Sequence, residues 1–136
     1  MPGNGRRWIA LAALALSACA KNAPREATVE SNGIRIEFNS ALHSRVTAKI
    51  GREERVLGEF VPSEFLRAGG RDITDFRLTA ASGDGGNWTL VGVAGSLQKT
   101  VGVRLNPEGL RMAFFEVEYA NRGESAIEIE GWTNNR

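Results

Sequence analysis

The residues from Leu110 to Trp132 read LRMAFFEVEYANRGESAIEIEGW and form two arms around a polar turn at 121–124. Apolar residues and glutamates alternate along both arms, and an Asn-x-Gly turn separates them. This pattern predicts a β-hairpin with one apolar and one acidic face. Because a hairpin is unable to bury its own apolar face, a second layer of sheet must cover it. The apolar face comprises Phe115, Val117, Tyr119, Ile127 and Ile129, and the acidic face comprises Glu116, Glu118, Glu128 and Glu130.

Segments with strand character continue through the rest of the chain, from about Gly33 onward, and short turn signals separate them. Thr74–Asp75 indicates a bend within an irregular strand, and residues 63–66 are either a helical turn or a kinked strand. Residues 82–87 are typical of a loop. No segment after Cys19 predicts a helix longer than a single turn, so the fold class is all-β, an antiparallel β-sandwich. The predicted strands are 34–38, 46–50, 56–61, 73–78, 88–93 and 97–105, followed by the two arms of the hairpin.

The N-terminal residues resemble a bacterial export signal with a lipid attachment site. Arg6 and Arg7 precede an apolar run at 8–16, and Leu-Ser-Ala-Cys ends at Cys19, the single cysteine. A basic start followed by a short apolar helix predicts a signal peptide, here residues 1–18, rather than a membrane span. The cysteine context resembles the lipobox, in which the thiol receives diacylglycerol. The alternative is an ordinary signal peptide with an incidental cysteine.

The resemblance to a lipobox implies a membrane partner and a location. The cysteine is followed by alanine and lysine, not by aspartate, which resembles the pattern sorted to the outer membrane. Lipidation at Cys19 also accounts for an unpaired thiol in an exported protein. Residues 19–31 are small and polar and contain a proline, so we expect a flexible tether. Residues 32–136 are then the β-sandwich domain.

Charge and length exclude several classes of function. The chain has 136 residues, 17 Lys and Arg against 16 Asp and Glu, and 42% hydrophobic residues, which fits one globular domain. Removal of Arg6 and Arg7 with the signal leaves 17 − 2 = 15 positive against 16 negative residues. A near-neutral balance gives no electrostatic basis for nucleic-acid binding. A near-neutral surface also fits an uncharged ligand such as a sugar.

No catalytic or metal-binding constellation is evident in the sequence. His43 is the only histidine and has no nucleophile in a recognisable motif beside it, so we interpret it as a loop-edge residue. Asp72, Asp75 and Asp84 have oxygen ligands that suit calcium, but their spacing favours solvated turn carboxylates. Gly83–Gly86 lacks the lysine of a phosphate loop. We expect no cofactor, and we expect the glutamate rows to face Arg or Lys of a neighbouring strand or domain.

Several motifs together are similar to one glycoside hydrolase family. They are IRIEF at 34–38, LGEFVPSEFL at 57–66, WTLVG at 88–92 and VEYANRGESAIEIEGWTN at 117–134. From about residue 32 to its end, the chain resembles the N-terminal β-supersandwich domain of α-galactosidases of glycoside hydrolase family thirty-six. The resemblance implies an incomplete supersandwich fold. It also implies a downstream (β/α)₈ barrel that carries an Asp nucleophile and an Asp acid/base. No catalytic residue is carried over to this chain, which is too short to contain that barrel.

Exposed aromatic residues are the remaining candidates for ligand contact. Trp88 begins a strand with two apolar faces, so we expect it in the core. Trp132 is followed by Thr133, Asn134 and Asn135, whose polar groups suit sugar hydroxyls, and this segment is the predicted carbohydrate or inter-domain contact. We expect further protein to follow Arg136, so that the chain supports a catalytic barrel or its carbohydrate substrate. The alternative is a stand-alone lipoprotein whose sandwich binds carbohydrate or a partner protein.

Overall fold

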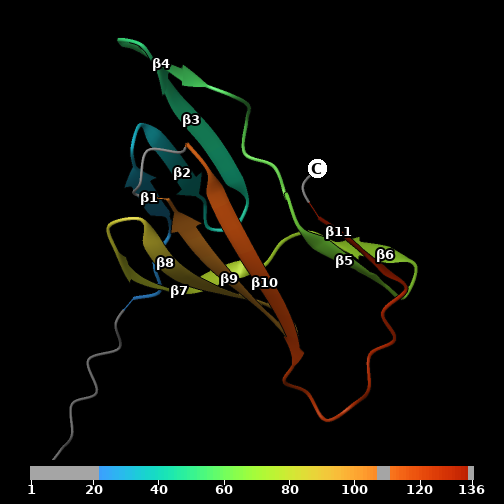
Figure 1. Ribbon diagram of the computed structural model, residues 1–136. Helices are drawn as coiled ribbons and strands as arrows, with labels where there is room; N and C mark the ends of the chain where they lie inside the picture. Colours follow the sequence, from blue (N-terminus) through green and yellow to red (C-terminus); the bar gives the residue numbers. More distant parts are fainter. Residues whose placement is uncertain (1–21, 107–110, 135–136) are drawn as a thin grey trace, which may run out of the picture.

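The computed structural model describes residues 22–106 and 111–134, and in these residues the chain forms strands and no helix (Figure 1). All strand pairs are antiparallel and belong to three sheets, ordered β1-β2-β3-β4, β10-β9-β8-β7 and β11-β5-β6. The predicted all-β, antiparallel β-sandwich class is therefore confirmed. The described residues contain no helix that is long and apolar enough to span a membrane. The strands are β1 Ala27–Ser31, β2 Ile34–Phe38, β3 Ser44–Ile50, β4 Glu53–Val56, β5 Phe65–Ala68, β6 Arg71–Ile73, β7 Arg77–Asp84, β8 Asn87–Ala94, β9 Leu97–Leu105, β10 Ala113–Asn121 and β11 Gly131–Thr133.

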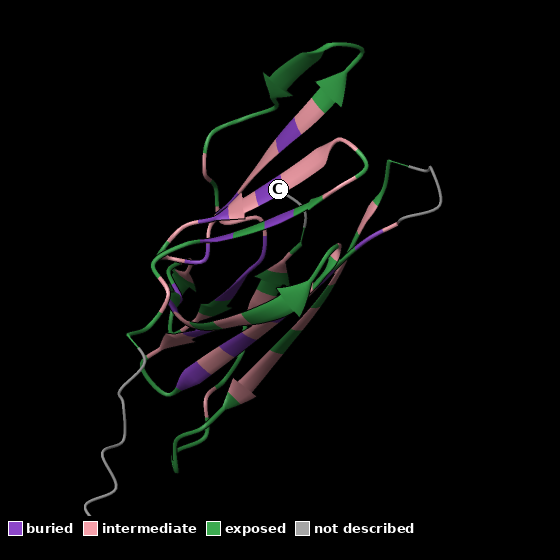
Figure 2. Cartoon of the chain, turned by 90° about the vertical axis from the view of Figure 1, so that its left-hand side faces the viewer, coloured by how far each residue is buried: buried purple, intermediate pink, exposed green. Residues whose placement is uncertain are grey.

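The first and second sheets share one hydrophobic core. Alternate residues of β1, β2 and β9 point inward, which is the period-two pattern of a half-buried strand. Figure 2 shows this alternation of buried and exposed residues along the strands, and it shows the β3–β4 hairpin reaching outward into solvent. The core contains residues from six strands, β1, β2, β5, β7, β8 and β9, and from the loops beside them. Its buried members are Ala27, Val29, Ile36, Phe38, Leu42, Leu66, Phe76, Leu78, Leu90, Leu97, Val101, Val103 and Leu105.

The prediction of a tether over residues 19–31 is wrong for its last five residues. Residues 27–31 form β1, which pairs with β2 along its whole length. Ala27 and Val29 are buried opposite Phe38 and Ile36 in that register. Ala27 and Val29 are the only apolar residues of β1, so the pairing with β2 decides the structure and the local pattern does not. The signal peptide at 1–18 and Cys19 lie outside the described residues.

The strands at the centre of the second sheet agree closely with the sequence. β8 and β9 contain the predicted strands 88–93 and 97–105, and a turn at Gly95–Ser96 connects them. The predicted loop at 82–87 is mostly strand, because Asp84 pairs with Asn87 across a turn at Gly85–Gly86. Two glycines therefore act as a tight hairpin turn here rather than as a loop.

The hairpin predicted for 110–132 does not form. β10 pairs with β9 over nine residues, whereas β11 pairs with β5 in the third sheet, where it lies beside β5 in Figure 1. A turn does follow β10, since Asn121 accepts a hydrogen bond from Gly123 N and donates one to Ser125 O. That turn directs residues 125–130 away from β10, and they form no strand. Alternation indicates strand character, but it does not identify the strand's partner.

Two further differences concern residues 56–78. The predicted strand at 56–61 does not form: β4 covers residues 53–56, and beyond it only Val61 makes an isolated bridge, to Ser44. Residues 65–68 are strand β5, which agrees with the kinked-strand alternative. The predicted bend at Thr74–Asp75 separates β6 from β7, and the register shifts again between Leu78 and Ala80. Gly58 and Pro62 account for the early end of β4, because both residue types weaken strands.

Candidate functional site

A pocket of about 280 Å³ lies between β10 and the β5–β11 pair, and we call it the β10–β11 pocket. β10 forms one wall because its odd-numbered side chains face inward. β5 and β11 form the other wall, since Leu66 and Trp132 are paired in the third sheet. The pocket therefore opens between two sheets that do not pair with each other. Its lining residues are Glu64, Leu66, Phe115, Val117, Tyr119, Trp132, Thr133 and Asn134.

Three residues of the predicted contact segment line this pocket. The side chain of Trp132 is on its rim, and the residue is 77% exposed. Thr133 and Asn134 lie beside it in the pocket lining, whereas Asn135 lies outside the described residues. These residues and the inner face of β10 line the same pocket. The sequence predicted them as the two arms of one hairpin, whereas in the structure they belong to different sheets. Trp88, in contrast, is half-buried against the core, and its indole N–H donates to Gly85 O.

A buried ion pair lies behind the pocket wall. Lys99 faces inward from β9 and is 1% exposed, and Glu64 is 4% exposed. Lys99 Nζ donates to the Glu64 carbonyl oxygen at 2.7 Å and to its carboxylate Oε2 at 3.2 Å. Ser63 Oγ donates to the other carboxylate oxygen at 2.7 Å, and Ser44 Oγ is 3.1 Å from Ser63 Oγ. Each of the two carboxylate oxygens therefore accepts a hydrogen bond, one from Lys99 and one from Ser63, as a buried charge requires.

This ion pair was not predicted from the sequence. A signal was present, because Lys99 occupies an inward position between Leu97 and Val101 in the otherwise apolar face of β9. Its partner Glu64 comes from a segment 35 residues earlier in the chain. No local spacing connects the two residues, so only the packing of the segment before β5 against β9 identifies the pair.

The ionisation of this cluster is shifted by its burial. Burial lowers the pKa of Lys99, and the charge and hydrogen bond of Glu64 partly offset that effect. Burial, followed by the negative charge of Glu64, raises the pKa of Tyr119 well above its usual range. The Tyr119 ring lies 5.7 Å from the Phe76 ring, centroid to centroid, and Lys99 Nζ lies 6.0 Å from the centroid of the tyrosine ring. The Tyr119 hydroxyl oxygen is buried and has no hydrogen-bond partner among the described residues.

The other predicted polar residues occupy solvated positions. His43 lies immediately before β3, at the edge of a loop, and its Nε2 is 2.9 Å from Asp75 Oδ1. Asp72 accepts a hydrogen bond from Arg67 at 2.9 Å, and Glu130 lies 3.6 Å from the same guanidinium. The expected Arg partner of the glutamate rows is thus present for Glu130, on strand β5. Residues 22–106 and 111–134 contain no group of three acidic, His or Cys side chains that could hold a metal ion.

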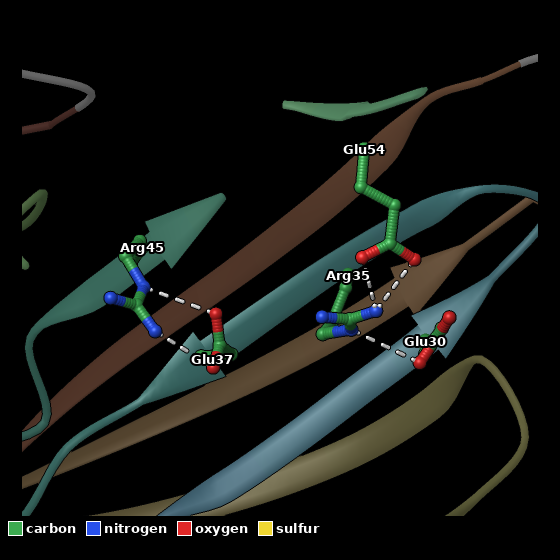
Figure 3. A network of polar contacts seen from close by, with 5 residues as sticks. All are labelled: Glu30, Arg35, Glu37, Arg45 and Glu54. Carbon is green, nitrogen blue, oxygen red and sulfur yellow. Dashed lines mark hydrogen bonds and ion pairs between the residues drawn. The ribbon is translucent and has the colours of Figure 1, made fainter. Parts of the chain in front are cut away.

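The outer face of the first sheet has paired charges. Figure 3 shows Arg35 between Glu30 and Glu54, and Arg45 beside Glu37. The hydrogen bond from Arg45 lowers the pKa of Glu37, and the guanidinium of Arg45 also lies 4.5 Å from the Phe60 ring centroid. These cations face carboxylates of the same sheet, so this face presents no excess of positive charge. Exposed pairs of this kind contribute little to stability.

A larger hollow of about 580 Å³ lies beside the second sheet and is open to solvent. Its polar side chains include Thr89, Arg104 and Glu116, all exposed, and Arg104 is stacked 5.2 Å from the Phe114 ring centroid. No buried polar group reaches this hollow from the lining. We therefore place the candidate site at the β10–β11 pocket, whose lining includes the buried Glu64, the exposed Trp132 and Tyr119, a tyrosine whose hydroxyl has no partner in the described part of the chain.

No protein-family model matches this chain, and neither a curated protein nor a solved structure matches it. A function for this chain consequently rests on its own geometry and on its sequence motifs.

Proposed function

We propose that this chain is a non-catalytic domain of an exported lipoprotein, and that it holds a polypeptide segment from a further domain or a separate protein against the β10–β11 pocket. One observation carries the proposal: β10 is the edge strand of the second sheet, and its inner face is only half covered. Phe115, Val117 and Tyr119 are half-buried in the pocket wall, in contrast to the fully buried inner face of the neighbouring β9. An open edge beside partly exposed apolar side chains is a typical protein-interaction surface.

The composition of the pocket supports a polypeptide as its occupant. The walls combine three aromatic residues, Phe115, Tyr119 and Trp132, with aliphatic side chains. Aromatic side chains in partly enclosed pockets provide much of the binding energy at protein interfaces. The lining also includes Thr133 and Asn134, whose polar groups suit the polar rim of such interfaces.

In the setting that the sequence resemblance implies, the bound polypeptide is the catalytic barrel of an α-galactosidase-like glycoside hydrolase. The proposed role of the chain is then to support that barrel while Cys19 holds the protein at the outer membrane through a lipid. All chemistry belongs to the barrel under this proposal. The stand-alone alternative keeps the same surface and the same anchor, with a separate protein as the partner.

Carbohydrate is the second candidate ligand, and one observation favours it. Trp132 is 77% exposed and lies beside Thr133 and Asn134 on the pocket rim, an arrangement that suits stacking on a sugar ring. Titration of the full chain with melibiose, followed by tryptophan fluorescence, tests this candidate against maltose as the control sugar. Saturable quenching by melibiose that Trp132→Ala abolishes supports carbohydrate. No change with either sugar excludes α-galactosides as ligands of this pocket.

The polypeptide proposal is tested by cysteine accessibility in the membrane of the native host. Trp132→Cys places a thiol on the pocket rim, and Arg52→Cys places one at the exposed tip of the β3–β4 hairpin as the matched control. Both variants are treated with a membrane-impermeant maleimide, first in cells made permeable to it and then after purification. The parent chain, whose only cysteine is Cys19, gives the background.

We expect position 132 to be protected in the membrane and reactive in the purified protein, because a bound polypeptide covers the pocket only in the native setting. Position 52 should react equally with the maleimide in the membrane and in the purified protein. Equal labelling of position 132 in the membrane and in the purified chain would show that nothing covers the pocket and would overturn the proposed function.

A further inference from the structure

The free edge of β10 presents its hydrogen-bonding groups at odd-numbered positions. Arg122 N donates to Ser96 O at 2.8 Å, and Asn106 N donates to Met112 O at 3.2 Å. The two bonds lie one beyond each end of the β9–β10 ladder, and the residue on the β10 side is even-numbered in both, Met112 and Arg122. The backbone N–H and C=O groups of the even-numbered residues of β10 therefore point toward β9. Neighbouring residues of a strand direct their backbone groups to opposite sides. The N–H and C=O groups of Phe115, Val117 and Tyr119 therefore point away from β9, and no strand within 22–106 or 111–134 pairs with them.

The two faces beside this edge have opposite chemistry. Phe115, Val117 and Tyr119 line the β10–β11 pocket, whereas Glu116 and Glu118 are exposed on the outer face. Neither glutamate forms an ion pair with a described residue, although ion pairs are frequent elsewhere on the surface. The edge thus combines unpaired backbone groups, an apolar pocket on one side and two unneutralised carboxylates on the other.

We propose that an extended segment of the bound polypeptide adds to β10 as a further antiparallel strand of the second sheet. Its alternate apolar side chains fill the β10–β11 pocket, and its intervening Lys or Arg side chains lie opposite Glu116 and Glu118 on the outer face. Backbone hydrogen bonds to Phe115, Val117 and Tyr119 hold the segment, which is the general mode of strand addition at a sheet edge. This inference rests on the proposed function and specifies the class of partner at the same site.

The charges of the edge argue against a second copy of β10 as the occupant. Two β10 strands paired edge to edge would place glutamates of one copy near glutamates of the other, and like charges on adjacent strands destabilise pairing. A basic segment gains attraction at the same positions. The free edge of β10 therefore favours a partner whose outward residues are positive.

The mode of binding can be tested with synthetic peptides whose backbone is modified at chosen positions. The probe alternates lysine with valine and isoleucine, as in Lys-Val-Lys-Ile-Lys-Val-Lys, and carries a fluorescent label for anisotropy measurements with the full chain in a mild detergent. In an antiparallel added strand, the apolar residues of the peptide direct their N–H groups toward β10 and the lysines direct theirs to solvent. N-methylation of the apolar residues therefore removes the proposed hydrogen bonds, whereas N-methylation of the lysines is the matched control.

We expect N-methylation at the apolar residues to weaken binding by about tenfold or more, because several backbone hydrogen bonds are lost. N-methylation at the lysines should change the affinity by less than about threefold, since their N–H groups face solvent in the added strand. Replacement of the peptide lysines by glutamate should weaken binding to the parent chain. Glu116→Lys/Glu118→Lys should reverse that preference, so that the acidic peptide binds more tightly than the basic one.

The outcomes separate the binding mode from the proposed function. Equal effects of the two N-methylation patterns, or no measurable binding of any peptide, would overturn strand addition. Binding of melibiose without binding of any peptide would also overturn it and would favour carbohydrate in the pocket. Protection of position 132 in the membrane together with equal N-methylation effects would leave the proposed function standing while excluding this mode. Loss of that protection would overturn both.

Discussion

Lys99 and Glu64 form an ion pair within the protein, with Lys99 Nζ 2.7 Å from the Glu64 carbonyl oxygen and 3.2 Å from its carboxylate. The pair connects β9, in the second sheet, to the residue that precedes β5, in the third sheet. A buried charge that loses its partner remains desolvated and uncompensated, whereas removal of both charges removes that penalty. The pair therefore positions the third sheet against the second, next to the pocket wall.

Lys99→Met should lower the free energy of unfolding by about 3–5 kcal/mol, because the buried Glu64 carboxylate is left without its cation. Lys99→Met/Glu64→Met should lose much less, since both charges are absent and Ser63 Oγ keeps its contact with Ser44 Oγ. Urea denaturation of the two variants and the parent chain measures the difference. A double variant that is no more stable than Lys99→Met would contradict the assignment of the pair.

Tyr119→Phe should leave the free energy of unfolding at neutral pH unchanged or slightly higher, because the buried hydroxyl has no partner to lose among the described residues. The pKa of Tyr119 is raised in the folded chain, so the tyrosine contributes stability below its unfolded pKa of about 10 and this contribution is lost as pH rises through the folded pKa. The parent chain should therefore lose stability from about pH 10 upward more steeply than Tyr119→Phe.

The titration itself can be followed directly, since Tyr119 is the only tyrosine in the chain. Phenolate absorbance in the near ultraviolet should develop at higher pH in the folded protein than in urea, and Tyr119→Phe provides the blank. A phenolate signal at the same pH in both states would show that Tyr119 is not buried as described.

Gly92→Ala should destabilise the fold by about 1–3 kcal/mol through overpacking. A Cβ at this position would lie 2.9 Å from the backbone oxygen of Phe76 and 2.9 Å from Leu42 Cδ2, both in the core. Gly102→Ala in the neighbouring strand is the matched control, because its Cβ would meet only Glu116, at 3.6 Å. The control should be neutral or stabilising by up to about 1 kcal/mol. Equal melting temperatures for the two variants would contradict the close approach of Phe76 to β8.

Cys19→Ser should abolish lipid attachment, because the serine hydroxyl does not replace the thiol that the lipobox resemblance assigns as the acylation point. The variant should incorporate no labelled fatty acid and should move from the membrane fraction to the soluble fraction. The parent chain and Arg52→Cys are the controls, since both retain Cys19. Membrane retention of the variant, with label still incorporated, would exclude Cys19 as the anchor.

Strand positions could be predicted from the sequence wherever large apolar residues alternate and turns are well marked. β2, β8 and β9 lie where the sequence predicts them, and all three belong to the core. β1 was missed because its alternating apolar residues are only Ala27 and Val29 and follow a polar stretch. Of the candidate site, the segment Trp132–Asn134 was identified from its composition, although its neighbours in space were not.

The sequence by itself determined the all-β class, because period-two alternation follows directly from strand geometry. Only the tertiary structure decided that β11 pairs with β5 instead of β10, and that Lys99 meets Glu64. The physical reason is that strand pairing and charge pairing join residues far apart in the chain. Local side-chain patterns set which faces are apolar, but the choice among distant partners depends on how all the sheets pack together. The pocket exists because this packing places β10 and β11 in different sheets.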